Sequence, residues 1–362
     1  MADTSLSSGD IPAINVQHPT APTAPARREA GLEPRVSPKL VGATLSPRTS
    51  ATPLPDDSII QPGAQPYNLP DPLPGILTKI KRIGGGAYGN VYQGVWTLPG
   101  KDPIPVAIKC IREAHLDDED DPQAKQERFE RRIRRETVIW QTTSHKNILP
   151  FHGYQIVDGE PMLVSPWCKN GSLASYVNEH PDLPDVEKLK LLRDAACGLA
   201  YLHSLQPPII HGDIKPDNVI ITDDKIGSLC DFGISRVMTS LGTHTGLTTS
   251  GQGAGTAGYQ AKELYDENSR PTAMSDVYAF GGLILTAMSG KSPFHKKTIA
   301  AAIIIAISLD ETPIPTDHVA LPEGDPLWGL LQRSWDPDPE QRPSMAQVVQ
   351  ELESEIRKRS GD

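Results

Sequence analysis

The 362-residue sequence has few cysteines, no long apolar run and no basic patch at its start. No C-x-x-C pair occurs, so neither a disulfide framework nor a zinc site is predicted, which fits a reducing interior. The most apolar run, Ile299 to Leu309, has 11 residues and is too short to span a bilayer. Because the first ten residues contain no apolar run either, we expect no secretory signal. The sequence predicts a soluble intracellular protein, cytoplasmic or also nuclear.

Basic residues are fewer than acidic residues in this sequence. The chain has 35 Lys and Arg against 45 Asp and Glu, a net charge of −10. Bulk electrostatic attraction to nucleic acid or to an anionic membrane is therefore not expected, and neither is predicted as a partner.

Aromatic residues are absent before Tyr67, and 14 of the 35 prolines fall in the first 75 positions. Such a segment cannot bury enough apolar surface to offset the entropy lost on ordering. Residues 1–70 are therefore expected to form a disordered, Pro-rich tail, and the sequence does not identify any partner of it.

The most informative stretch runs from His211 to Asn218, and Asp-Phe-Gly begins at Asp231. Asp213 and Asn218 are five positions apart, and Asp231 lies 18 beyond Asp213. Two apolar runs flank the polar turn Thr222–Lys225, which predicts a hairpin between Asn218 and Asp231. Because a hairpin returns its ends to one place, these two residues can share a metal ion. Their oxygen ligands suit Mg²⁺, which also takes phosphate oxygens.

A glycine-rich turn lies earlier in the chain. Gly84, Gly86 and Gly89 make G-x-G-x-x-G between two strand-like runs, and glycines let backbone amides approach phosphate. A dinucleotide-binding fingerprint would need a helix after the turn, whereas a strand is predicted here, so that interpretation fails. Lys109 follows in the apolar strand Val106–Ile111, where a lysine is costly unless it is paired.

These motifs resemble, in the same order, those of the eukaryotic protein kinases, over about residues 76–358. The chain departs from that family at Gly212, where an Arg is usual, and at Lys262, where the turn Gly255–Glu263 normally has a Pro. His-Gly-Asp also occurs in small-molecule phosphotransferases, but Asp276 and Arg342 belong to the protein kinase pattern and are not expected in those enzymes. The other alternative is a pseudokinase that acts only as a binding module. A pseudokinase normally lacks the strand lysine or one of the two aspartates described above, and all of them are present here. Lys215 together with Thr256 resembles the serine/threonine pattern rather than the tyrosine one, and the chain looks closest to the tyrosine-kinase-like group.

The resemblance implies an α+β, two-lobed fold. A β-rich lobe would cover about 76–165 and a helical lobe about 169–358. Asp276 would begin a buried helix, cap it and hold the backbone of the His211–Asn218 loop, and Arg342 would pair with Glu263.

The resemblance also implies ATP, Mg²⁺ and a protein substrate, with transfer of the γ-phosphate to serine or threonine hydroxyls. Asp213 would act as base, Lys215 would neutralise phosphate charge, and Asn218 and Asp231 would hold the metal. Lys109 would bind phosphates and pair with a glutamate of the helix predicted over Gln123–Gln141. Glu136 is our choice for that glutamate, with Glu127 and Glu130 as competitors. The nucleotide would contact Ile83, Gly84, Gly86, Gly89, Val91, Ala107, Ser165, Pro166, Cys168 and Ile220.

Overall fold

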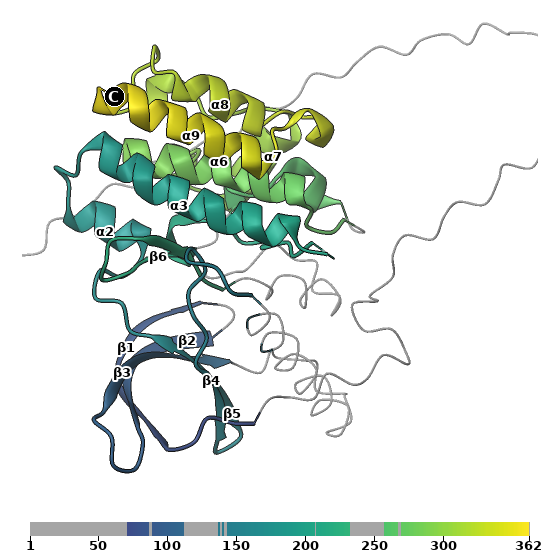
Figure 1. Ribbon diagram of the computed structural model, residues 1–362. Helices are drawn as coiled ribbons and strands as arrows, with labels where there is room; N and C mark the ends of the chain where they lie inside the picture. The colour runs from purple at the N-terminus through teal and green to yellow at the C-terminus, as the bar shows by residue number, and fades with distance from the viewer. Residues whose placement is uncertain are drawn as a thin grey trace, which may run out of the picture. The chain divides into compact units, whose positions relative to one another are not determined.

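The computed structural model describes residues 71–86, 89–111, 137, 140, 143–206, 208–231, 257–266 and 269–361 (Figure 1). The chain divides into two units, 1–56 and 57–362, and every described residue belongs to the second. Several predictions lie outside the described residues. They are the tail 1–70, Glu127, Glu130 and Glu136 with most of their helix, the loop after Asp231, and Gly255 and Thr256.

Five antiparallel strands form one sheet in the order β1-β2-β3-β5-β4 (Figure 1). The strands are β1 (Ile76–Gly86), β2 (Gly89–Thr97), β3 (Ile104–Ile111), β4 (Gly153–Val157) and β5 (Glu160–Pro166). Side chains alternate between the two faces of a strand. Val106, Ile108 and Cys110 of β3 therefore share one face, where they pack with Met162 and Val164. Lys109 belongs to the opposite face, which is the face that carries the candidate site.

The segment just before β1 is part of this sheet structure. The backbone N–H of Leu73 donates to the carbonyl of Tyr154 on β4 at 2.8 Å. The side chain of Gln155 donates to the carbonyls of Leu73 and Gly75, at 2.7 and 2.9 Å. Because β1 and β4 are the two edge strands, these bonds connect one edge of the sheet to the other.

The rest of the described chain is mainly helical. Its helices are α2 (Leu173–Glu179), α3 (Asp185–Ser204), α6 (Ala273–Ser289), α7 (Ala300–Ser308), α8 (Leu327–Ser334) and α9 (Met345–Ser360). Short 3₁₀ turns are η1 (Pro216–Asn218), η2 (Lys262–Tyr265), η3 (Pro315–Asp317) and η4 (Pro339–Gln341). A two-stranded hairpin, β6 (Val219–Ile221) and β7 (Gly227–Leu229), lies among them. A β-rich part followed by a helical part is the α+β, two-lobed architecture that the sequence predicted.

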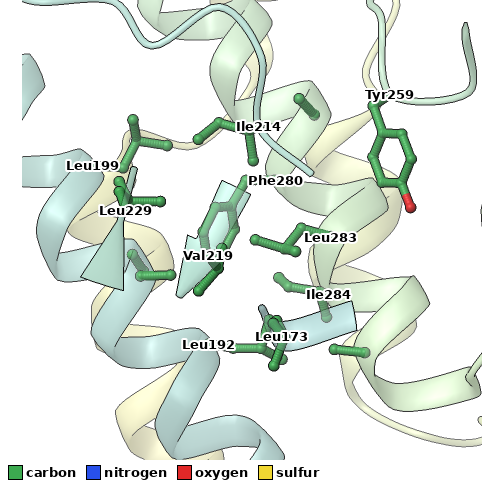
Figure 2. Packing of buried hydrophobic residues seen from close by; sticks show 14 of the residues in the cluster. Leu173, Leu192, Leu199, Ile214, Val219, Leu229, Tyr259, Phe280, Leu283 and Ile284 are labelled. Carbon is green, nitrogen blue, oxygen red and sulfur yellow. The ribbon is translucent and has the colours of Figure 1, made fainter. Parts of the chain in front are cut away.

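The helical part is organised around α6. This helix has no charged residue after Asp276 and is buried nearly all round, as expected for a helix that is apolar on every face. Figure 2 shows the ring of Phe280 among side chains of the hairpin and of α6, close to Val219 and Leu283. The helices α3 and α9 pack side by side, and α3 also contacts α6 and β7 (Figure 1). The hairpin that carries the candidate site is thereby fixed on a rigid core.

The helix caps correct one prediction. Thr272, and not Asp276, caps α6: Thr272 Oγ1 accepts the N–H of Ser275, and Ser275 Oγ accepts the N–H of Thr272. This reciprocal pair is a capping box, which satisfies two backbone donors at the start of the helix. Asp276 lies one residue further along and uses its carboxylate elsewhere. In the part of the chain that is described, no helix combines the length and apolar character needed to cross a bilayer.

Candidate active site

The carboxylate of Asp213 is held by two side chains of its own loop, His211–Asn218. Lys215 Nζ donates to Asp213 Oδ2 at 2.7 Å. Asn218 Nδ2 donates to the same oxygen at 2.9 Å and to the backbone carbonyl of Asp213 at 2.7 Å. The 3₁₀ turn η1 brings Asn218 back toward Asp213. Because the amide nitrogen of Asn218 faces Asp213, its Oδ1 is directed away and is the oxygen that can contact a cation.

Asp276 holds the backbone of this loop, as predicted. Its Oδ2 accepts the N–H of His211 at 2.8 Å, and its Oδ1 accepts the N–H of Gly212 at 2.7 Å. His203, at the end of α3, places Nε2 2.9 Å from Asp276 Oδ2. Hydrogen bonds to a buried carboxylate are charge-assisted and strong, so the loop is anchored to α6 directly before Asp213.

His211 connects the two halves of the site. It is fully buried, and burial lowers its pKa, so the ring is neutral. The N–H of Asp213 donates to Nδ1 at 3.3 Å, which makes Nδ1 the acceptor and Nε2 the nitrogen that carries hydrogen. Nε2 lies 3.0 Å from the carbonyl of Cys230. His211 therefore links Asp213 to the residue before Asp231.

The hairpin predicted between Asn218 and Asp231 is confirmed. β6 and β7 pair antiparallel, and the N–H of Cys230 donates to the carbonyl of Asn218 at 3.0 Å. This bond joins the two open ends of the hairpin and brings Asn218 next to Asp231. Asp231 has φ +62°, a left-handed conformation that Asp adopts more readily than most residues.

Lys109 connects the sheet to the hairpin. Its Nζ lies 3.1 Å from Asp231 Oδ1. The side chain is largely buried, and a buried lysine is tolerated when it has an anionic partner. Its cross-strand neighbours are Val91 of β2 and Leu163 of β5. Two motifs far apart in the sequence are thus joined at one point.

The glycine-rich turn connects β1 to β2. Gly84 pairs with Val91, and Gly86 pairs with Gly89, across the antiparallel strands. A Cβ at Gly89 would lie 2.2 Å from the carbonyl oxygen of Cys110, so the neighbouring strand itself requires glycine there. Among the described residues, a Cβ at Gly84 would meet no atom within 4 Å. None of them therefore requires glycine at Gly84, but a group that approaches the backbone closely, such as a phosphate, would.

The hinge segment, Pro166–Ser172, runs from β5 to α2 and is tied to the hairpin. The N–H of Lys169 donates to Asp223 Oδ1 at 2.9 Å, and Ser172 forms an isolated bridge with Ile220 of β6. These bonds place Ile220 at the hinge segment.

The start of the hinge faces β3 in register. Ser165 pairs with Ala107 and is buried, and Pro166 pairs with Val106. Burial raises the pKa of the Cys168 thiol to about 11, so the thiol is protonated at neutral pH. Ala107 pairs with Ser165, and Pro166 and Cys168 follow Ser165 in the chain. These four predicted contacts therefore lie in one connected region.

These residues together resemble a nucleotide site, and comparison with known proteins agrees. A family model described as protein tyrosine and serine/threonine kinase matches residues 77–352. The chain belongs to this family. Similar proteins include one named as a probable leucine-rich repeat receptor-like protein kinase of Arabidopsis thaliana, 32% identical over 289 residues, 76% of this chain and 28% of that protein. The dual specificity protein kinase shkC of Dictyostelium discoideum is 28% identical over 279 residues, 76% of this chain and 50% of that protein.

Receptor-interacting serine/threonine-protein kinase 3 of Rattus norvegicus is 28% identical over 280 residues, 74% of this chain and 54% of that protein. The matches thus span about a quarter to a half of the length of these relatives. Membership of the kinase family accounts for the two-lobed fold and implies ATP as substrate.

The predicted pair of Arg342 and Glu263 is present in the helical part of the protein. Arg342 donates to both carboxylate oxygens of Glu263, at 2.6 and 3.0 Å. The same guanidinium donates to the carbonyls of Asp336 and Met274. The side chain of Arg342 is fully buried, and its guanidinium satisfies backbone carbonyls as well as the carboxylate. Lys262, the departure from the usual proline, pairs with Asp310 at 2.5 Å.

Sequence reasoning missed His203. The side chain of His203 contacts the carboxylate of Asp276, which anchors the His211–Asn218 loop. The available signal was a histidine directly after the buried Leu202 of α3, eight positions before His211. Glu136 lies outside the described residues, so its pairing with Lys109 stays a prediction.

Proposed function

We propose that this protein is an ATP-dependent protein kinase that transfers the γ-phosphoryl group to serine and threonine hydroxyls of proteins. The observation that carries the proposal is the ion pair of Lys109 and Asp231, at 3.1 Å. This ion pair places Lys109 of β3 beside Asp231, at one end of the hairpin. Asn218 lies at the other end and donates to Asp213.

Asp213 is the proposed base. A carboxylate that accepts the substrate hydroxyl proton must be ionised and correctly oriented. Lys215 donates to the Asp213 carboxylate at 2.7 Å and Asn218 donates to the same oxygen, so these two side chains orient the proposed base. Lys215 can also neutralise charge on the phosphoryl group as it moves, because most of phosphoryl-transfer catalysis is positioning and charge neutralisation.

Mg²⁺ fits the donor set at the mouth of the hairpin. Asn218 Oδ1 and the Asp231 carboxylate are the proposed ligands, and Mg²⁺ characteristically takes one or two such groups with waters and phosphate oxygens. When bound, the ion supplies charge neutralisation for the phosphates. Lys109 would then contact phosphate oxygens, and Glu136 is the proposed carboxylate that holds Lys109 from the predicted helix.

The adenine ring is proposed to lie between apolar side chains of both lobes. Ile83, Val91 and Ala107 would cover it from the sheet, and Ile220 from the hairpin. The backbone carbonyl of Pro166 and the N–H of Cys168 would bind its edge, since Pro166 has no N–H to offer. Gly84, Gly86 and Gly89 would admit the phosphates, and Ser165 would line the back of the pocket.

Two other functions remain to be separated. A small-molecule phosphotransferase is disfavoured by the buried pair of Arg342 and Glu263 and by the anchoring of the loop on Asp276. A pure binding module is disfavoured because Lys109, Asp213, Asn218 and Asp231 are all present.

Serine/threonine preference is supported by Lys215 with Thr256, and by the name of the rat relative. The Dictyostelium relative is named a dual specificity kinase, so tyrosine transfer is the competing outcome.

The test uses the full chain with Mg²⁺, radiolabelled ATP and a generic basic protein, followed by phosphoamino-acid analysis. Phosphoserine and phosphothreonine are expected, and Lys109→Met should remove nearly all of the label. Lys190→Met, at an exposed position of α3, is the matched control and should retain it. Absence of transfer together with stabilisation by ATP in a thermal melt would identify a binding module. Phosphotyrosine as the main product would overturn the substrate assignment alone.

A further inference from the structure

The second half of the hinge segment is bound to the hairpin. Four successive residues, 169–172, each contact β6 or the turn that follows it. The N–H of Lys169 donates to Asp223 Oδ1 at 2.9 Å. The other contacts are Asn170 Nδ2 to the carbonyl of Thr222 at 2.6 Å, the carbonyl of Gly171 to the N–H of Ile221 at 2.9 Å, and the bridge of Ser172 with Ile220. This half of the hinge segment is therefore part of the hairpin structure.

The first half of the hinge segment is supported by the sheet instead. Its register with β3 ends at Pro166. The N–H of Trp167 donates to the carbonyl of Pro105 at 3.4 Å, which is long for a hydrogen bond. Burial is the main cause of the raised pKa of the Cys168 thiol, and the negative charge of Asp223 is the second cause, so this carboxylate lies close to Cys168. The chain therefore passes from the sheet to the hairpin at Cys168, beside Asp223.

The bond from Lys169 to Asp223 holds the peptide group that follows Cys168. Its acceptor is a carboxylate, and hydrogen bonds to ionised groups are stronger than those between neutral groups. Lys169 and Asp223 are both exposed, so water reduces this advantage to that of an ordinary hydrogen bond. A binding group that is already held in place loses less conformational freedom when its ligand arrives, and the ligand then binds more tightly.

We propose that Asp223 is a positioning residue for nucleotide binding, which holds the hinge segment so that the N–H of Cys168 faces the adenine ring. The inference rests on the proposed function, in which this N–H binds the edge of the ring. Asp223 acts through Lys169 and the hinge backbone rather than on the nucleotide itself.

The same arrangement connects the adenine site to the metal site. The strand β6 begins directly after Asn218, carries Ile220 at its centre and leads into the turn that contains Asp223. Asn218 is a proposed metal ligand, and Ile220 is proposed to cover the adenine ring. The hydrogen bond of Asp223 therefore holds the hinge segment on the strand that carries these two residues.

The first test measures the binding of a fluorescent ADP analogue to the full chain in the presence of Mg²⁺. Asp223→Ala should weaken binding by about three- to tenfold, the range expected for one hydrogen bond. Asp223→Asn keeps an oxygen that can accept the N–H of Lys169, and it should bind within about twofold of the wild type. Asp224→Ala is the matched control and should bind like the wild type, because Asp224 is the next residue of the same turn and is also exposed.

Equal binding by Asp223→Ala and by the wild type overturns the proposal. An Asp223→Asn variant as weak as Asp223→Ala also overturns it, because the charge rather than the accepted hydrogen bond would then be responsible. A loss of the same size in Asp224→Ala would show a general disturbance of the turn, with the same consequence. Absence of nucleotide binding by the wild-type chain is a different result, which overturns the proposed nucleotide site itself.

The second test separates positioning from a purely structural role by steady-state kinetics of the full chain. Asp223→Ala should raise KM for ATP by about three- to tenfold and leave kcat within about twofold, the pattern expected when binding is lost equally from the ground state and the transition state. The unfolding temperature without nucleotide should not change, since the substitution is at the surface. A fall in kcat with unchanged KM, or a lower unfolding temperature without loss of nucleotide affinity, contradicts the proposal.

Discussion

Gly212 donates its backbone N–H to Asp276 at 2.7 Å while its own φ is +77°. This left-handed conformation carries no strain in glycine, whereas it costs other residues about 1–2 kcal/mol. The loop that positions Asp213 therefore adopts its anchored conformation without a backbone penalty.

Replacement of Gly212 by Ala should lower the free energy of unfolding by about 1–2 kcal/mol, because alanine is strained at this φ. The transfer rate should fall as well, since the next residue is Asp213. Gly329→Ala is the control: Gly329 lies within α8, where a Cβ meets only Arg333 at 3.6 Å, so stability should rise. Urea unfolding measures both variants, and a Gly212→Ala protein as stable as the wild type would contradict the argument.

Activity should not require phosphate on the loop that follows Asp231. An arginine beside the base is the usual partner of such a phosphate, through charge-assisted hydrogen bonds, and Gly212 removes that cation. Treatment with phosphatase, or alanine at Thr248, Thr249 and Ser250, should change the initial rate by less than about tenfold, or about 1.4 kcal/mol of barrier. A larger loss in either experiment would mean that another residue, with Arg236 as the candidate, takes the place of the missing arginine.

The sequence predicted the parts of the site that depend on local spacing. The hairpin and the position of Asn218 followed from two apolar runs around a polar turn, because strand pairing is specified locally. The pairing of Arg342 with Glu263 came from resemblance, since no periodicity connects residues 79 positions apart.

Other features could not be predicted. His203 contacts Asp276 only because α3 and α6 pack together, which is a tertiary relationship. The cap of α6 was misplaced because Thr272 and Asp276 are both good N-terminal residues, and only the packing decides which of them turns toward the loop.

Ser165 should control access behind the adenine ring. It is buried at the end of β5, opposite Ala107, so a larger side chain would fill the space beside it. Ser165→Met should weaken ATP analogues with a bulky adenine substituent by at least about tenfold, or about 1.4 kcal/mol, with little change for ATP. Competition binding of one such analogue and of ATP measures both affinities. Equal losses of affinity for the two ligands would show that residue 165 does not control access to the space behind the adenine ring.

Arg342 should contribute far more to stability than an arginine in an exposed pair. Its fully buried guanidinium pairs with Glu263, and removing one partner of a buried pair costs about 3–5 kcal/mol. Arg333→Ala is the matched control, because Arg333 pairs with Glu351 while half exposed, and such pairs contribute about 0–1 kcal/mol. Thermal and urea unfolding of the two variants should differ accordingly, and similar losses would indicate that Glu263 and Arg342 do not act as a buried pair.

The most direct measurement of the proposed chemistry compares two aspartates of the same loop. Asp213 is held by Lys215 and Asn218, whereas Asp217 is exposed within η1. Loss of a general base lowers the rate by about 10²–10⁴-fold. Asp213→Asn should therefore reduce kcat for protein phosphorylation by at least about 100-fold while ATP still stabilises the protein in a thermal melt. Asp217→Asn should leave kcat within about threefold of the wild type, since a surface substitution disturbs little. Retention of near-normal kcat by purified Asp213→Asn, with its fold intact, would contradict the account.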